Sequence, residues 1–197
     1  MTKPIAPALV LGSSSPYRRE LLQRLRIPFE VVVPDVDETP QANETPQQLA
    51  CRLAMQKAQA VAAKFPSCIV IGADQVADLA GQSLGKPGTH ANAVAQLQRM
   101  QGQQVVFQTA LAVVCHSKAF AQLELAQVKV GFRQLSQAQI EAYLQAEKPY
   151  DCAGSAKSEG LGIALTTSIV SDDPTALMGL PLIRTCRLLE AAGLRLF

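Results

Sequence analysis

The sequence contains no tryptophan and few other aromatic residues, with three tyrosines and six phenylalanines among 197 residues. A buried core must therefore be built from Leu, Val, Ile and Ala, and the hydrophobic fraction of 48% is large enough to build one. An excess of charge of one sign is also missing, because 18 Lys and Arg residues nearly balance 16 Asp and Glu residues. Without a basic tract the chain has no predicted surface for a nucleic-acid duplex, so we expect no nucleic-acid partner.

The sequence has little of what disulfide frameworks and metal cages require. Its five cysteines are widely spaced without a CxxC motif, and neither His90 nor His116 has an acidic or cysteine neighbour at metal-ligand spacing. We therefore expect reduced, mostly buried thiols in a reducing compartment. The first residues of the sequence have too short an apolar run for a signal peptide. No segment approaches the ~20 apolar residues of a membrane span. These features predict a soluble, cytoplasmic protein with no membrane partner.

Short apolar runs alternate with helical patterns, which is typical of an α/β protein. Residues 68–73 (CIVIGA) are fully apolar and predict a central strand. Predicted strands cover residues 8–12, 29–33, 68–73, 105–115 and 120–132. Predicted helices begin at the capping positions Ser15, Thr45, Thr89 and Ser136, and a last helix runs from Pro181 to Ala192.

The two longest strands predict an antiparallel hairpin with a short turn at residues 116–118. The apolar alternation changes phase between Leu125 and Val128, which suggests a β-bulge. After a glycine-rich loop over residues 149–162 we expect two short strands. We interpret residues 1–197 as a single α/β domain, in which a mixed, twisted sheet with flanking helices forms an elongated, two-lobed unit with a central cleft.

The loop over residues 12–19 (GSSSPYRR) lies between a predicted strand and a predicted helix start. Backbone N–H groups, three serine hydroxyls, a helix N-terminus and a pair of arginines together make a good phosphate cradle. The alternative is a polar loop in which Ser15 only caps the helix. The segment is not a Walker motif, because GxxxxGK[ST] is absent.

Four further segments carry possible chemistry. Asp74 and Gln75 follow the central strand, where a carboxylate can bind a cation or take a proton from water, or can simply cap a turn. Lys86, between Gly85 and Pro87, offers a point charge for a phosphoryl oxygen or is an exposed hairpin lysine. The acidic residues 35–38 (DVDE) suit Mg²⁺ or Mn²⁺ but equally suit a solvated loop. Residues 153–160 (AGSAKSEG) form a small-residue loop that a ligand can approach closely or that is plain surface.

The ordered motifs SxSxYRR, VDE, QKA, GADQ, GKP, AGSxKSEG and GLP resemble the Maf family of nucleoside triphosphate pyrophosphatases. The resemblance covers nearly the whole chain. It implies a Maf- and ITPase-like fold, a homodimer, and a divalent metal cation (Mg²⁺, Mn²⁺ or Co²⁺). It also implies hydrolysis of a small-molecule nucleotide between its α- and β-phosphates, giving the monophosphate and pyrophosphate.

The resemblance also implies roles for individual residues. Asp74 matches the catalytic carboxylate of the family, and Asp37, Lys57 and Lys86 match its other essential polar positions. Asp37 stands where many members have Glu, which keeps the charge but shortens the reach. Asp37 and Asp74 are the expected metal ligands. The phosphate-binding loop of the family is matched by Ser13, Ser15, Arg18 and Arg19.

Three positions separate this chain from the commoner branch of the family, which is associated with dTTP and UTP. That branch has SPRR, GADT and a late Gln-Gly, where this chain has Tyr17, Gln75 and Glu159. The combination resembles the branch that acts on 7-methyl-GTP. Tyr17 would stack on the cationic base, Glu159 would accept its N–H donors, and Gln75 would contact the base or the sugar. The alternative is that Tyr17 packs on its own helix and Glu159 pairs with Lys157 or an arginine.

Two functions remain in competition at this point. The first is an enzyme that removes a modified nucleotide from the pool. The second is a nucleotide-binding regulator of cell division or septum formation, with incidental or broader hydrolysis of dTTP or UTP. The retention of both Asp74 and Lys86 favours the enzyme, because a pure binder of a polyanion has no need of a carboxylate facing it.

Overall fold

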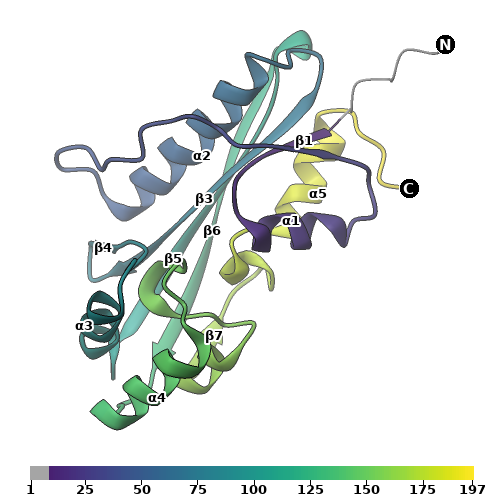
Figure 1. Ribbon diagram of the computed structural model, residues 1–197. Coiled ribbons are helices and arrows are strands. Elements are labelled where there is room, and N and C mark those ends of the chain that lie inside the picture. Colours follow the sequence, from purple (N-terminus) through teal and green to yellow (C-terminus); the bar gives the residue numbers. More distant parts are fainter. Residues whose placement is uncertain (1–8) are drawn as a thin grey trace.

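The computed structural model describes residues 9–197, and Ala8 together with the segment before it lies outside the described residues. Figure 1 shows long strands running through both halves of the molecule, with helices on either side of the sheet. The strands are β1 (Leu9–Gly12), β2 (Glu30–Val32), β3 (Ile69–Leu79), β4 (Gln82–Leu84), β5 (Gln104–Cys115), β6 (Phe120–Phe132) and β7 (Thr166–Val170). They form one seven-stranded sheet in the order β2-β1-β3-β5-β6-β7, and β4 pairs with β3.

The sheet is mixed, as predicted. β1 pairs in parallel with both β2 and β3, and the remaining pairs are antiparallel. The helices are α1 (Pro16–Gln23), α2 (Pro46–Ala62), α3 (His90–Met100), α4 (Gln137–Glu147) and α5 (Leu182–Ala191). The predicted caps are confirmed, since Ser15, Thr45, Thr89 and Ser136 each accept a hydrogen bond from a backbone N–H in the first turn of their helix.

Three hydrophobic clusters cover the sheet, and the two that share one face lie in different lobes. On one face, Ile71 of β3 packs with α1 and α5, and Ala77 further along the same strand packs with α3 and α4. On the opposite face, Val70 and Val76 pack with α2. Because side chains alternate along a strand, β3 serves all three clusters and links the two lobes. The α/β class and the two-lobed architecture are confirmed, whereas an open central cleft stays a prediction.

Helix α2 lies very close to β3 at Gly72. A Cβ atom built at Gly72 would lie 2.3 Å from the carbonyl oxygen of Ala54 and 2.5 Å from the amide nitrogen of Ala58. Only glycine can stand at this position with α2 where it lies. The close approach brings Lys57, the residue before Ala58, against the strand two residues beyond Gly72.

The predicted hairpin of β5 and β6 is confirmed, but the predicted bulge is wrong. Register continues without interruption from Gln104 opposite Gly131 to Cys115 opposite Phe120. The phase change has another cause, because Leu125 packs with the α2 cluster while Val128 packs with the α3–α4 cluster on the other face. The strand therefore exchanges the face that it buries without inserting a residue.

The chain after the glycine-rich loop forms one strand, β7, and not the two that the sequence predicts. Residues Leu161–Leu165 form 3₁₀ turns, and so do residues Ala176–Met178. Where a second strand was expected, the chain turns after Asp173, whose carboxylate accepts a hydrogen bond from the backbone N–H of Thr175, two residues later. The last helix spans Leu182–Ala191 and is followed by Gly193, close to the prediction.

Candidate active site

The ammonium group of Lys57 lies between two carboxylates. Its Nζ atom is 2.6 Å from Oδ1 of Asp74 and 2.7 Å from Oε1 of Glu38. Lys57 and Asp74 are buried, whereas 57% of the Glu38 side chain is exposed. The three side chains come from α2, from β3 and from the loop between β2 and α2. Formally the cluster carries one negative charge.

Cations surround this cluster and stabilise the ionised form of Glu38. Burial alone would raise the pKa of Glu38. The hydrogen bond from Lys57 and the positive charges of Lys57, Lys86 and Arg18 outweigh burial, so the pKa lies below its ordinary value. Three basic side chains from separate parts of the sequence thus act on one carboxylate. We call Arg18, Lys57 and Lys86 the cationic group.

The serine-rich loop holds Arg18 in place. Ser15 caps α1 and accepts a hydrogen bond from the backbone N–H of Arg18, and buried Ser13 accepts one from the Arg18 guanidinium, both at 3.4 Å. The Nε–H of Arg18 also donates to the carbonyl oxygen of Gly179 at 2.9 Å. Burial lowers the pKa of Arg18, while the carboxylates of Asp74 and Glu38 oppose that shift. The hydrogen bonds to Ser13 and Gly179 therefore fix the orientation of the guanidinium.

A pocket of about 540 Å³ contains the cationic group and both carboxylates. Nine of the eleven site residues predicted from the sequence line this pocket: Ser13, Ser15, Tyr17, Arg18, Lys57, Asp74, Gln75, Lys86 and Glu159. They come from five separate segments of the chain, around residues 13–18, 57, 74–75, 86 and 159. The fold thus brings these motifs together around one pocket, and their functional roles stay a prediction.

A second set of side chains in the pocket surrounds Tyr17. Its hydroxyl donates a hydrogen bond to Asp151 at 3.3 Å, and the Sγ atom of Cys152 lies 3.9 Å from the same oxygen. Burial is the main cause that raises the pKa of the Cys152 thiol to about 12, and the charges of Asp151 and Glu159 add to it. Both carboxylates therefore act on the same thiol. We call Tyr17, Asp151 and Glu159 the tyrosine group.

A cation already lies over the ring of Tyr17. Nζ of Lys157 is 5.7 Å from the ring centroid, within the range of a cation–π contact. Lys157 also pairs with Glu147 at 3.0 Å. Lys157 therefore does not form with Glu159 the short ion pair that the alternative interpretation of Glu159 proposes.

Gln75 points away from the side of the sheet that Asp74 faces. Its amide nitrogen lies 2.9 Å from the hydroxyl of Thr109 and 3.0 Å from the carbonyl oxygens of both Ala176 and Leu177. Successive side chains of a strand point to opposite faces, so Asp74 meets α2 while Gln75 meets the turn after β7. The amide N–H₂ of Gln75 is thus engaged by the protein.

Two predicted site residues do not join the others. The carboxylate of Asp37 accepts a hydrogen bond from the backbone N–H of Thr39 at 2.9 Å and lines a separate hollow of about 640 Å³ next to Arg52. Arg19 is exposed on α1 and does not line the pocket of Arg18. The predicted metal pair of Asp37 and Asp74 is therefore not brought together.

Glu38 and Asp151 are pocket residues that the sequence interpretation missed. Glu38 stands in the quoted VDE motif, but neighbouring residues of an extended loop point in different directions, and the sequence gives no direction. The salt bridge to Lys57 identifies Glu38 as the residue of this motif that reaches the cluster. Asp151 directly precedes Cys152 at the start of the glycine-rich loop, and nothing in its local sequence pairs it with Tyr17.

The carboxylates of the pocket suit a divalent cation held in part by a ligand. Across residues 9–197, no three His, Cys, Asp or Glu side chains gather into a metal cage. Glu38 and Asp74 nevertheless present carboxylate oxygens on the pocket wall. Mg²⁺ is commonly bound by one or two carboxylates together with substrate phosphates and water. This pair of donors fits that mode of binding.

Comparison with known proteins identifies the family. The model of the family described as "Maf-like protein" matches residues 8–192, and the chain belongs to this family. A protein of Albidiferax ferrireducens named 7-methyl-GTP pyrophosphatase is 73% identical over 195 residues, which cover 99% of this chain and 98% of that protein. Proteins of the same name from a Polaromonas species and Cupriavidus metallidurans are 68% and 56% identical, each over 98% of this chain and over 89% and 97% of their own length. The family predicted from the motifs is confirmed.

None of the helices among residues 9–197 combines the length and apolar character needed to cross a membrane.

Proposed function

We propose that this protein is a nucleoside triphosphate pyrophosphatase that hydrolyses 7-methyl-GTP to 7-methyl-GMP and pyrophosphate and so removes a modified nucleotide from the pool. Relatives that are 53–73% identical over nearly the whole chain carry the name of this activity. The observation that carries the proposal is that one pocket joins the cationic group, the Lys57–Asp74–Glu38 cluster and the tyrosine group.

The cationic group offers charges for a triphosphate. Arg18 offers a fork of N–H donors, and Lys86 offers an ammonium group on a long side chain. The serine-rich loop offers hydroxyl groups and the start of a helix. Lys57 neutralises part of the charge of Asp74 and Glu38, which would otherwise repel the polyanion. As pyrophosphate leaves, negative charge grows on its oxygens, and fixed cations stabilise that charge without reorganisation.

Asp74 is the group that we assign to the attacking water. Lys57 binds Oδ1, and we assign Oδ2 to orienting the water and accepting its proton. The water oxygen bonds to the α-phosphorus, the bond from that phosphorus to the bridging oxygen breaks, and pyrophosphate leaves with the electron pair. Asp74 then releases the proton to solvent.

The resemblance to the family implies a divalent cation, and we propose that Asp74 and Glu38 hold it. When bound, such a cation supplies positive charge to the phosphates and polarises the water. This assignment replaces the expected pair of Asp37 and Asp74, because Asp37 faces another hollow. Loss of activity with EDTA, restored by Mg²⁺, Mn²⁺ or Co²⁺, is the expected result, and full activity in EDTA would contradict it.

The tyrosine group suits a base that carries positive charge. Methylation at N7 gives guanine a delocalised charge, and the ring of Tyr17 already attracts the cation of Lys157. The carboxylates of Asp151 and Glu159 add negative charge to the same part of the pocket. A carboxylate can also accept hydrogen bonds from N1–H and the exocyclic amine of guanine, donors that a pyrimidine does not present in this arrangement.

The reaction itself is tested with the purified protein in ¹⁸O-labelled water. We expect release of pyrophosphate, with the label in 7-methyl-GMP, because water attacks the α-phosphorus. Label in pyrophosphate would mean attack at the β-phosphorus and would contradict the proposed step. Absence of turnover would favour the alternative of a nucleotide-binding regulator of division.

We also propose that the protein is a homodimer in the cytoplasm. The dimer is implied by the resemblance to the family. No disulfide links the five cysteines, all of which lie within residues 9–197, and this suits a reducing compartment. Light scattering over a range of protein concentrations tests the dimer, and a monomer at every concentration would contradict it.

A further inference from the structure

The turn Ala176–Met178 and the following Gly179 form the part of the pocket wall that touches Arg18. Leu177, Met178 and Gly179 line the pocket. Gly179 has a φ of 98° and turns its carbonyl oxygen toward Nε of Arg18, at 2.9 Å. A Cβ atom at Gly179 would lie 3.4 Å from the same Nε. The orientation of the guanidinium therefore depends on where this turn lies.

The turn is tied to the sheet through the carbonyl groups of Ala176 and Leu177, both of which accept a hydrogen bond from Gln75. The oxygen of Ala176 accepts hydrogen bonds from the amide of Gln75 and from the hydroxyl of Thr109, both at 3.0 Å. Thr109 is completely buried and stands opposite Gln75 in the β3–β5 register, in the region where the two lobes meet. Because its hydroxyl also lies 2.9 Å from Gln75, Thr109 holds both the turn and the side chain that ties it.

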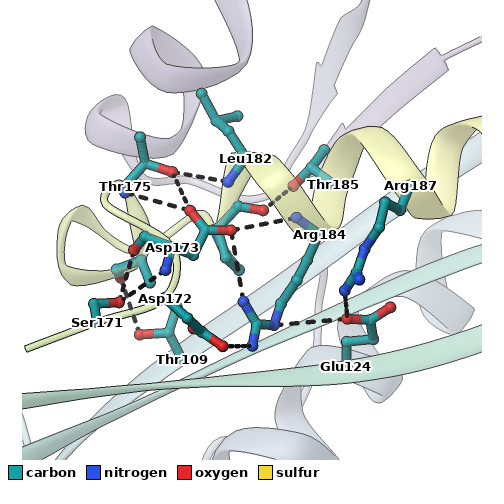
Figure 2. A network of polar contacts seen from close by, with 12 residues as sticks. Thr109, Glu124, Ser171, Asp172, Asp173, Thr175, Leu182, Arg184, Thr185 and Arg187 are labelled. Atoms are coloured by element: carbon teal, nitrogen blue, oxygen red, sulfur yellow. Dashed lines mark hydrogen bonds and ion pairs between the residues drawn. The ribbon is translucent and has the colours of Figure 1, made fainter.

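The other side of the turn is tied to α5 through Asp173, as Figure 2 shows. The side chain of Asp173 is completely buried, and its carboxylate accepts hydrogen bonds from the backbone N–H of Arg184 at 3.2 Å and from the hydroxyl of Thr175 at 3.0 Å. Thr175 in turn accepts from the N–H of Leu182 at 2.8 Å. The start of α5 is thus capped by the segment that leads into the pocket turn, and not by Pro181.

Two anchors therefore fix one turn, and the turn orients one arginine. We propose that Thr109 and Asp173 are positioning residues for catalysis, which set the place of Arg18 through the turn and Gly179 without touching the nucleotide. The inference rests on the proposed function, in which Arg18 binds the triphosphate. Small displacements of a positioned group lower rates strongly, so loss of either anchor has a measurable cost.

Thr109 gives the sharper test because two substitutions differ by one hydroxyl. Thr109→Val keeps the shape of the side chain and removes the bond to Ala176, whereas Thr109→Ser keeps the hydroxyl. We expect Thr109→Val to lower kcat/KM for 7-methyl-GTP about tenfold and Thr109→Ser to stay within about twofold of the wild type. Equal values for the two variants would overturn the proposal.

A double-mutant cycle separates positioning from a general loss of structure. If Thr109 acts through Arg18, Thr109→Val costs less than about twofold when it is introduced into Arg18→Ala. The same tenfold cost in both backgrounds would show that Thr109 acts elsewhere and would overturn the proposal. The variants that carry Arg18→Ala have low activity and are measured at high enzyme concentration. Thermal unfolding confirms that each variant is folded.

The second anchor is tested with a neighbouring control. Asp173→Asn weakens the acceptor at the start of α5, and we expect a loss of about fivefold in kcat/KM that also vanishes in the Arg18→Ala background. Asp172→Asn changes the adjacent carboxylate, which is exposed and pairs with Arg184 at 2.9 Å, and leaves kcat/KM within about twofold. If Asp173→Asn does not fold, the Thr109 cycle decides alone.

Failure of the proposed function is distinguishable from failure of this inference. If the wild type does not hydrolyse 7-methyl-GTP, the proposed function fails, and the Thr109 and Arg18 cycle is repeated on the binding of inorganic tripolyphosphate. Non-additive effects on that binding support positioning of Arg18. Additive effects overturn it, whatever the substrate is.

Discussion

The Lys57–Asp74 ion pair and the carboxylates of the tyrosine group are built on different kinds of support. Lys57 and Asp74 are buried on a helix and a strand that Gly72 brings into close contact, and their ion pair is 2.6 Å long. Asp151 and Glu159 are exposed and stand on the loop that follows α4. The ion pair is therefore shielded from solvent, whereas the carboxylates of Asp151 and Glu159 remain in contact with it.

This difference separates the chemistry from the selection of the base. A step at phosphorus depends on charges fixed within fractions of an ångström, which secondary structure provides. Recognition of a base by exposed carboxylates is weaker for each contact, because water competes. We therefore expect substitutions in the cluster to abolish turnover for every nucleotide, and substitutions in the tyrosine group to change mainly the choice between nucleotides.

The largest effect is expected for Asp74→Asn. The amide is a poor base and a poor cation ligand, and it removes one of the two carboxylates that pair with Lys57, so kcat should fall on the order of 10²-fold or more. Asp78→Asn on the same strand is the matched control, since Asp78 binds Gly81 and Gln108 and does not line the pocket. Turnover of Asp74→Asn near the wild-type rate would refute the assignment.

The neighbours Glu38 and Asp37 give the next effect and the cleanest contrast. Glu38→Gln removes a charge from Lys57 and from the proposed cation, and kcat/KM should fall about tenfold to a hundredfold. Asp37→Asn alters a residue of another hollow and should leave kcat/KM within about twofold. Steady-state kinetics with 7-methyl-GTP measure both, and the reverse order would restore Asp37 as the site residue.

A smaller, selective effect is expected in the tyrosine group. Glu159→Gln weakens a charge-assisted hydrogen bond that solvent already screens, so kcat/KM for 7-methyl-GTP should fall about tenfold. Asp151→Asn should cost about threefold through the lost charge near Tyr17. Unmodified GTP should be affected less by both variants. Equal losses for the two nucleotides would mean that these carboxylates do not sense the cationic base.

The smallest effect concerns stability at low pH. The pKa of Glu38 lies below its ordinary value of 4.5, so its ion pair stabilises the fold above that pH, and this contribution is lost as the pH falls through the folded-state pKa. The difference in urea midpoint between the wild type and Glu38→Gln should therefore shrink between about pH 7 and about pH 3. A difference that is constant over this range would contradict the shifted pKa.

The α/β class and the helix starts could be predicted from local signals. Ser15 and Thr45 cap helices wherever the tertiary structure places them, because the capping bond is made within one turn. The site residues, Lys57 among them, are instead assigned through the resemblance of seven ordered motifs to the Maf family, because each local signal alone also fits a plain structural role. The phase change near Leu125 led to the wrong prediction of a bulge. An alternation of apolar residues shows that a residue is buried, but it does not show which of the two cores buries it.

The remaining features depend on contacts that no local pattern encodes. The sequence cannot distinguish Asp37 from Glu38, because the choice rests on the place of Lys57 on a distant helix. Nor can it foresee that Gln75 binds the turn after β7, about a hundred residues later in the chain. In the sequence Asp173 resembles an ordinary loop residue, and only the structure shows its hydrogen bond to the start of α5.

The central claim is that one pocket binds and hydrolyses the triphosphate with its cationic group and Asp74, and selects a cationic base with its tyrosine group. A competition assay tests this claim most directly. Equimolar 7-methyl-GTP, GTP, dTTP and UTP are incubated together with the purified protein, and the loss of each is followed by chromatography. The account predicts that 7-methyl-GTP is consumed at least about tenfold faster than any of the others, and that Glu159→Gln narrows this ratio. Equal rates of consumption for all four nucleotides would contradict it.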